Sequence, residues 1–344
     1  MKHSTLILSL VGIGILVAMV LIIGPSKIVS AVELANPWYL ILAVLIQFAI
    51  YGFWTQRWAI NVSSVDINVK KLHLFPMLMV GLAINNLTPS ARGGGEPVRG
   101  YILSKYSKTS FEKSFATVIA DRGLDTFPFM VLAVITIICL VLFMTLSELI
   151  VIGLIIAVIA LLIIFIIALY MSINKEFGKK ATLWIVKVIK RFSRKEHSKL
   201  EEKALTVIQG FQNSMRTMIK DKNVLMYGLP ISFIIWIFEI SRVYIVFLAF
   251  GAPVSPITIA EVFIISTLLG MIPLLPGGLG AVDGVMIILF SAAGVPPSIS
   301  AAATIVERLI SFWMTTIIGV AVLPYFGTGV VDKIFDKDSD SNKN

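Results

Sequence analysis

The chain has 344 residues, 57% of them hydrophobic and 14% charged, with a formal net charge of +9 and a mean hydropathy of +0.92. This composition excludes a soluble globular protein and predicts an all-α protein that crosses the membrane several times. One cysteine and three scattered histidines exclude a disulfide framework or a cysteine-based metal site, so we expect no metal, no cofactor and no nucleic-acid partner.

Apolar runs, taken in chain order, predict six membrane-spanning helices at about residues 5–23, 38–53, 115–143, 149–171, 225–250 and 298–325. The first run also fits a signal peptide with cleavage near Ala31, but its length favours a retained anchor. Arg57 is assigned to a polar loop after the second span. We interpret residues 1–331 as one transmembrane domain and residues 332–344 as a polar, disordered tail.

The apolar sequence breaks between the second and third spans, over about residues 72–103. Its centre reads Thr88-Pro89-Ser90-Ala91-Arg92-Gly93-Gly94-Gly95-Glu96-Pro97-Val98-Arg99, and these prolines and glycines cannot lie inside one continuous helix. The apolar part is too short to span a bilayer, and the charged residues must face protein or water. We predict two half-helices that meet inside the membrane, with Pro97 first in the second, whose free N–H groups would bind an anion. A cytoplasmic loop after a short helix is the alternative.

Residues 175–222 differ from the rest of the chain because they contain thirteen Lys and Arg residues against five acidic ones. Apolar residues recur there at helical spacing, which predicts two amphipathic helices lying on the membrane surface. Their positive charge suits an anionic lipid surface on the cytoplasmic side. The alternative is a plain cytoplasmic loop that obeys the positive-inside rule.

A second broken segment, at about residues 257–293, repeats the features of the first. Each segment has a proline, then glycines followed by an acid, and further on an adjacent acid and arginine. In the first segment these are Pro89, Glu96 and Asp121-Arg122. In the second they are Pro276, Asp283 and Glu307-Arg308. This correspondence predicts an internal repeat, with repeat one at about 37–143 and repeat two at about 224–325.

The Lys and Arg residues orient the predicted spans. The N-terminus, residues 175–222 and the C-terminus carry positive charge and are expected to be cytoplasmic in a multi-pass protein of the cell membrane. Both flanks of the first broken segment are then cytoplasmic and both flanks of the second are external. We therefore predict two opposed re-entrant hairpins in an inverted repeat, an arrangement found in many secondary transporters.

The candidate substrate-binding residues are charged residues and glycines in or near the two breaks: Arg92, Gly94, Gly95, Glu96, Arg99, Asp121, Arg122, Asp125, Gly278, Gly280, Asp283, Glu307 and Arg308. Arginine forks would hold phosphate oxygens, while the acids orient the arginines or bind an amine or a proton. The alternative is structural, with each acid neutralising an arginine, and it applies equally to Glu239 and Arg242, which lie one helical turn apart.

Catalytic chemistry has no support in the sequence. The chain contains no Ser/His/Asp set, metal cluster or dinucleotide fingerprint. Gly93-Gly94-Gly95 is not followed by the lysine and Ser/Thr of a phosphate-binding P-loop. We therefore do not expect an enzyme.

At these residues the chain resembles the flippase-like family that includes the membrane portion of lysylphosphatidylglycerol synthase. The resemblance covers nearly the whole chain and rests on Thr88-Pro89-Ser90, Gly94-Gly95-Glu96-Pro97, Arg99, Asp121-Arg122, Asp125 and Pro276-Gly277-Gly278-Leu279-Gly280 leading to Asp283. It implies an integral membrane protein that moves, or helps to move, a lipid between leaflets. The family more often has Glu at the position of Asp283. No soluble aminoacyl-transfer domain follows the membrane part here, so we expect the synthase reaction to be absent.

These observations together predict a flippase-like transport protein that moves an anionic or phosphate-bearing lipid between leaflets. Glu96 and Asp283 would position the arginines that hold the phosphate, namely Arg92, Arg99, Arg122 and Arg308. The alternatives are a membrane-embedded transferase or accessory subunit for lipid-linked substrates, and a small-solute transporter.

Overall fold

The computed structural model describes residues 21, 25–88, 93–143, 148–192, 200–272 and 275–326, and every regular element within them is a helix. The long helices are α2 (Pro25–Glu33), α3 (Pro37–Ser63), α4 (Lys71–Leu87), α5 (Gly95–Ser107), α6 (Phe111–Phe143), α7 (Glu148–Ile173), α8 (Lys175–Phe192), α9 (Leu200–Lys220), α10 (Lys222–Ala249), α11 (Pro256–Gly270), α12 (Ala281–Ala292), α13 (Pro297–Arg308) and α14 (Met314–Val322). Short turns are η1 (Pro276–Gly278), η2 (Leu309–Trp313) and η3 (Leu323–Phe326). The predicted all-helical class is therefore confirmed.

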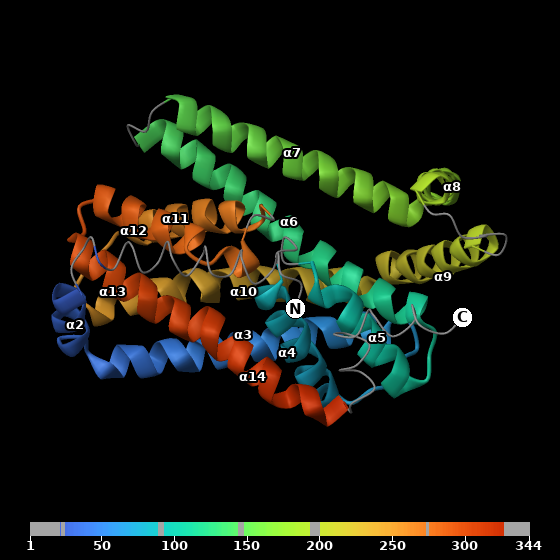
Figure 1. Cartoon of the computed structure of the whole chain (residues 1–344), viewed down its shortest axis with the longest axis horizontal. Helices are drawn as coiled ribbons and strands as arrows, with labels where there is room; N and C mark the ends of the chain where they lie inside the picture. Colours follow the sequence, from blue (N-terminus) through green and yellow to red (C-terminus); the bar gives the residue numbers. More distant parts are fainter. Residues whose placement is uncertain are drawn as a thin grey trace.

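Five helical segments are long and apolar enough to cross a membrane: Pro37–Ser63, Phe111–Val141, Ile152–Ile173, Lys222–Ala249 and Pro297–Phe326. They coincide with five of the six predicted spans and run along the long axis of the molecule (Figure 1). The last of them joins α13 to α14 through the π-helical turn η2. Except for residue 21, the predicted span at 5–23 lies outside the described residues, as does the predicted tail at 332–344.

Helix α3 corrects one prediction, because Arg57 lies inside this helix and not in a loop. The helix continues to Ser63, ten residues beyond the predicted end of the span, and Arg57 is buried. The prediction ended the span at residue 53 and placed Arg57 in the loop after it, since an isolated charge is costly in hydrocarbon. Here two carboxylates on α6, from Asp121 and Asp125, pair with Arg57 and remove that cost.

The two broken segments form two helical hairpins, α4 with α5 and α11 with α12, whose helices pack against each other. In Figure 1, α11 and α12 lie toward one end of the long axis, while α5 lies toward the other. The hairpins meet where η1 packs against α4. At this contact a Cβ on Gly277 would lie 2.9 Å from the carbonyl oxygen of Asn86, so the two backbones approach closely.

The start of α5 differs from the prediction, because the helix begins at Gly95 and Pro97 is its third residue. Proline is still tolerated there, since the N–H groups of the first turn have no partner within the helix. The glycines before it have a packing role. A Cβ on Gly95 would overlap the backbone of Gly81 in α4, so only glycine lets the two helices approach this closely.

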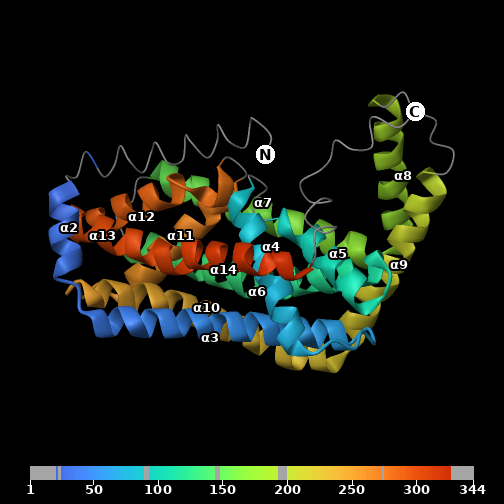
Figure 2. The same cartoon turned by 60° about the horizontal axis from the view of Figure 1, so that its bottom comes forward.

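The amphipathic segment forms α8 and α9, which pack against each other. Gln212 and Arg216 of α9 donate hydrogen bonds to the carbonyls of Met171 and Ile173 at the end of α7 and of Asn174 directly after it. The C-terminal half of α9 also packs on α6 and buries Met215 and Met218. Protein therefore covers this part of α9, whereas both helices were predicted to lie on the membrane surface. Helix α8 turns sharply away from the direction of α7 (Figure 2).

Candidate functional site

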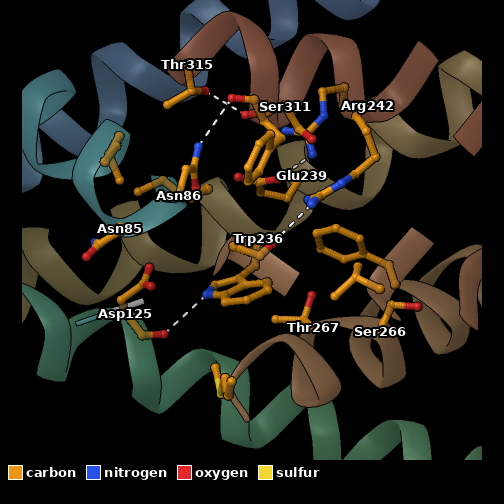
Figure 3. Close-up of a pocket in the computed structure, with 18 of the residues that line it drawn as sticks. Asn85, Asn86, Asp125, Trp236, Glu239, Arg242, Ser266, Thr267, Ser311 and Thr315 are labelled. Carbon is orange, nitrogen blue, oxygen red and sulfur yellow. Dashed lines mark hydrogen bonds and ion pairs between the residues drawn. The ribbon is translucent and has the colours of Figure 1, made fainter. Parts of the chain in front are cut away.

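A cavity of about 470 Å³ lies where the hairpin tips meet the long helices. Its charged and amide lining residues are Asn85, Asn86, Arg122, Asp125, Glu239, Arg242, Glu307 and Arg308. Figure 3 shows Asn85 and Asn86 of α4 on one side of the view, and Ser266 and Thr267 of α11 on the other. Residues from both hairpins and from six of the longer helices, α3, α6, α7, α10, α13 and α14, thus converge on one cavity.

In repeat one, Arg57 of α3 holds the two carboxylates of α6. Its Nε donates to Oδ1 of Asp121 at 2.8 Å, and its Nη1 donates to Oδ1 of Asp125 at 2.7 Å and to Oγ of Ser232 at 3.1 Å. Asp121 also accepts from Nη2 of Arg99 at 3.1 Å. Four charged groups from three helices thus form one buried network.

Arg122 turns away from its neighbour Asp121 and reaches the first hairpin. Its Nε donates to Oε1 of Glu96 at 2.5 Å, and Asn85 donates to the same oxygen at 3.1 Å. The backbone N–H of Gly95 donates to Oδ1 of Asn85 at 2.6 Å. Arg122 therefore ties the tip of α5 to α6 through a carboxylate.

In repeat two, Arg242 of α10 takes the place that Arg57 has in repeat one. Its Nη2 lies 2.8 Å from Oε1 of Glu307 on α13 and 2.7 Å from Oε2 of Glu239, and its Nη1 donates to Oε1 of Gln47 at 2.5 Å. Glu239 and Arg242, one turn apart, do form the predicted pair. Arg242 is 1% exposed, so it belongs to the framework behind the cavity surface more than to the surface itself.

Arg308 joins the second hairpin to α13 as Arg122 joins the first to α6. Its Nε lies 2.7 Å from Oδ1 of Asp283, and its Nη2 donates to the carbonyl oxygen of Gly277 at 3.1 Å. The guanidinium also stacks over the ring of Phe312 at 4.5 Å. Gly278 and Gly280, in the same turn, adopt positive φ angles of 70° and 79°, which glycine accepts without strain.

The same pairing scheme therefore occurs twice. In each repeat the arginine of the first long helix binds the acid of the last one, and the arginine beside that acid binds the acid of the hairpin. The adjacent acids and arginines, Asp121 with Arg122 and Glu307 with Arg308, were considered as pairs in the structural alternative. Each of the four residues finds its partner on a different helix, so the acids do neutralise arginines as that alternative expects, but not between neighbours in the chain.

Exposure separates the arginines that a ligand can reach from those that it cannot. The side chain of Arg122 is 31% exposed and that of Arg308 is 11% exposed. Arg99 is only 1% exposed, stacks over Trp58 at 4.2 Å and does not line the cavity. Arg92 lies outside the described residues. Of the predicted phosphate ligands that the structure describes, Arg122 and Arg308 are thus the two that line the cavity.

The hairpin N-termini were predicted to present free N–H groups, but two of these groups already have partners. Gly95 N–H donates to Asn85, and Gly280 N–H donates to Oδ2 of Asp283 at 2.7 Å. A short polar side chain at the start of a helix commonly satisfies the first N–H groups in this way. Gly94, directly before α5, is its N-cap residue. Side chains therefore provide the polar surface of the cavity more than the helix ends do.

Arg57 and the hydroxyl side chains of α11 are functional candidates that were not predicted from the sequence. The internal repeat contained information that could have identified Arg57. The sequence separation between Arg57 and Arg242 is only one residue shorter than the separation between Asp121 and Glu307. Applied to Arg242, the repeat would have pointed to Arg57. Ser266 and Thr267 lie in an apolar helix with no charged neighbour nearer than Glu261, so no local pattern distinguished them.

One wall of the cavity reaches the outer surface of the helix bundle. Leu161 and Ile164 of α7 line it, and Ile164 is 63% exposed. Only 6% of the most apolar part of α7 is buried, far less than in the other four long segments. A helix of this composition that is so little covered by protein faces lipid. The cavity thus borders the lipid through α7.

Comparison with known proteins shows similarity over nearly the whole chain. The family model described as the lysylphosphatidylglycerol synthase TM region matches residues 7–319. A UPF0104 membrane protein of Methanothermobacter thermautotrophicus is 58% identical over 337 residues, which is 98% of this chain and 100% of the relative. A UPF0104 membrane protein of Methanocaldococcus jannaschii is 32% identical over 96% of both chains. One of Pyrococcus horikoshii is 30% identical over 91% of this chain and 94% of the relative.

Proposed function

The chain belongs to the family of the lysylphosphatidylglycerol synthase transmembrane region, and from this premise we propose that it moves a phosphate-bearing lipid between the two leaflets of the membrane. The observation that carries the proposal is the combination of two features in one cavity. Reachable arginines, Arg122 and Arg308, line its interior, and the lipid-facing helix α7 forms part of its wall. A lipid needs both features, since its headgroup is polar and its tails are not.

The cavity would lower the main barrier to lipid movement. A charged headgroup in the hydrocarbon core loses its hydration, which costs several kcal/mol or more. Arginine forks replace that hydration with charge-assisted hydrogen bonds to phosphate oxygens. In this proposal Arg122 and Arg308 bind the phosphate, and Glu96 and Asp283 hold the two guanidinium groups in place. The tails remain in lipid beside α7.

We further propose that the two hairpins are re-entrant and belong to an inverted repeat. Their helices are of 12 to 17 residues, too short to span the hydrocarbon core. Their tips meet at Gly277 and Asn86, and the same ion-pair scheme occurs in both halves. Rocking of one repeat against the other around this contact would open the cavity to each leaflet in turn. The N-terminus, residues 175–222 and the C-terminus would be cytoplasmic.

We also propose that α8 lies in the membrane interface and binds anionic lipid headgroups. Phe177 of α8 makes an edge contact with Tyr170 of the lipid-facing helix α7, and both rings are exposed. Trp184, two turns further along α8, is 66% exposed. Lys180 and Lys187 are also exposed, next to these aromatic residues on the helix surface. Aromatic rings beside lysines are typical of helices at the headgroup level.

Reconstitution into vesicles tests the transport proposal. We would follow lipids that carry a fluorophore on one tail and measure how fast a membrane-impermeant reductant bleaches the inner-leaflet population. Removing one charge-assisted contact of about 1.5–3 kcal/mol should slow movement by about 10–100-fold in Arg122→Gln. Arg122→Lys should recover only part of the rate, because an ammonium group cannot form the fork.

The matched control is Lys105→Gln, which removes an exposed charge outside the cavity and should leave the rate unchanged. Vesicles with the wild-type protein that bleach no faster than protein-free vesicles would overturn the proposal. Movement of a small phosphate solute without lipid movement would favour the solute-transporter alternative.

A further inference from the structure

We propose that the headgroup is rich in hydroxyl groups, a polyol or sugar linked to phosphate, and that Ser266, Thr267 and Ser311 bind these hydroxyls. The inference rests on the proposed function, since it names the substrate class of the same cavity. All three side chains line the cavity, the first two on α11 and the third on η2 (Figure 3).

Most hydroxyl side chains in the long helices of this protein are satisfied by their own helix. Thr55, Thr126 and Thr315, for example, each donate to the carbonyl oxygen four residues earlier, at 2.6–2.8 Å. This local hydrogen bond is the usual arrangement for serine and threonine inside a helix. It leaves such residues with little remaining need for a ligand.

Ser266 departs from this arrangement. It is 1% exposed, and its Oγ is buried without a hydrogen-bond partner among the described residues. A buried hydroxyl without a partner costs about 1–3 kcal/mol, so such a group in a folded protein calls for an explanation, such as a functional role or a bound partner. Thr267, the next residue, and Ser311 also make no side-chain hydrogen bond within the part of the chain that the structure describes, although both border the cavity. Three hydroxyls without an internal partner among the described residues therefore lie in the wall of one cavity.

The positions of these hydroxyls relative to the arginines suit a phosphate joined to a polyol. The arginines enter the cavity from α6 and α13, while Ser266 and Thr267 enter from α11. Ser311 lies three residues after Arg308, at the position where repeat one has Asp125 after Arg122. The second half thus offers a neutral hydroxyl where the first offers a carboxylate. The cavity volume, about 470 Å³, lies within the range of sites for small ligands of this kind.

Hydroxyl groups of a ligand match these side chains because each hydroxyl can donate and accept one hydrogen bond. A site built to bind ligand hydroxyls discriminates strongly against an analogue that lacks them, since the protein hydroxyls then stay unpaired. We therefore expect headgroup selectivity from these residues, whereas the arginines bind any phosphate.

The experiment compares tail-labelled phosphatidylinositol with tail-labelled phosphatidic acid in vesicles, for three proteins. The wild-type protein should move phosphatidylinositol at least about 10-fold faster than phosphatidic acid. The double variant Ser266→Ala/Thr267→Val should lower the phosphatidylinositol rate to that of phosphatidic acid, so that the preference is lost. The control Thr55→Val removes a buried hydroxyl that its own helix satisfies, and should keep the preference.

A binding measurement separates this inference from the transport proposal. We would compare the thermal stabilisation of the purified protein by short-chain phosphatidylinositol and by short-chain phosphatidic acid. A larger shift with the inositol lipid that is lost in the double variant supports the hydroxyl site, even if no lipid moves in vesicles. Equal shifts and equal rates for the two lipids would overturn it, as would a double variant that retains the preference.

Discussion

Replacing Arg57 by leucine should destabilise the protein far more than removing any exposed charge. Arg57 is 2% exposed and donates three hydrogen bonds, to Asp121, Asp125 and Ser232, at 2.7–3.1 Å. Arg57→Leu leaves Asp121, also 2% exposed, with Arg99 as its remaining charged partner. Breaking a buried ion pair from one side costs about 3–5 kcal/mol because the remaining carboxylates stay buried and lose their nearest positive charge. That is about a 10²–10⁴-fold change in the ratio of folded to unfolded protein.

Thermal and denaturant unfolding in one detergent, monitored by circular dichroism, would measure the loss. Lys105→Gln is the matched control, since exposed substitutions usually change stability by no more than about 0.5 kcal/mol. Arg242→Leu tests the same reasoning in repeat two, where the arginine holds Glu239 and Glu307, and should cost a similar amount. If Arg57→Leu unfolds with the same midpoint as the control, the ion-pair framework does not hold the helices together.

Three further outcomes are expected. Gly95→Ala should destabilise the protein by about 1–3 kcal/mol, because the added Cβ would overlap the backbone of α4. In the control Gly52→Ala the added Cβ meets no atom within 4 Å, so the stability should not change. Equal unfolding midpoints for the two variants would contradict the close packing of α4 and α5. In a cysteine-free background, Ser110→Cys should react with an impermeant thiol reagent only from inside and Pro253→Cys only from outside; external labelling at residue 110 would refute the re-entrant hairpin. A bimane label at Trp184→Cys should be quenched by anionic lipids that carry bromine near the headgroup, whereas a label at Lys179→Cys should not. Equal quenching of the two labels would contradict the proposed position of α8 in the interface.

The hairpins could be predicted from the sequence because proline and glycine act on the backbone locally. A proline removes a hydrogen-bond donor wherever the chain goes, and a glycine run weakens any helix. The breaks after Leu87 and before Ala281 follow from this chemistry. The acid–arginine pairs of the two halves were recognisable for a similar reason, since charged residues are rare and costly within apolar helices.

The limits of that reasoning appear at Arg57 and at α9. Arg57 was placed in a loop, because its stabilising carboxylates come from α6, far away in sequence. The apolar side of α9 was assigned to the membrane, because a helical pattern marks an apolar face without saying what covers it. In the structure α6 covers its C-terminal half. Both errors concern partners that lie distant along the chain.

A helical membrane protein, the positions at which its helices break and the recurrence of its charged residues in two halves could all be predicted from the chain alone. These properties follow from hydropathy, backbone chemistry and spacing, which are local. The packing of the helices sets which guanidinium group meets which carboxylate, so that Arg122 and Arg308 line the cavity while Arg99 is buried outside its lining. It also decided that the Oγ of Ser266 has no partner among the described residues. Pairing and burial depend on the packing of several helices at once, and no single stretch of sequence specifies that packing.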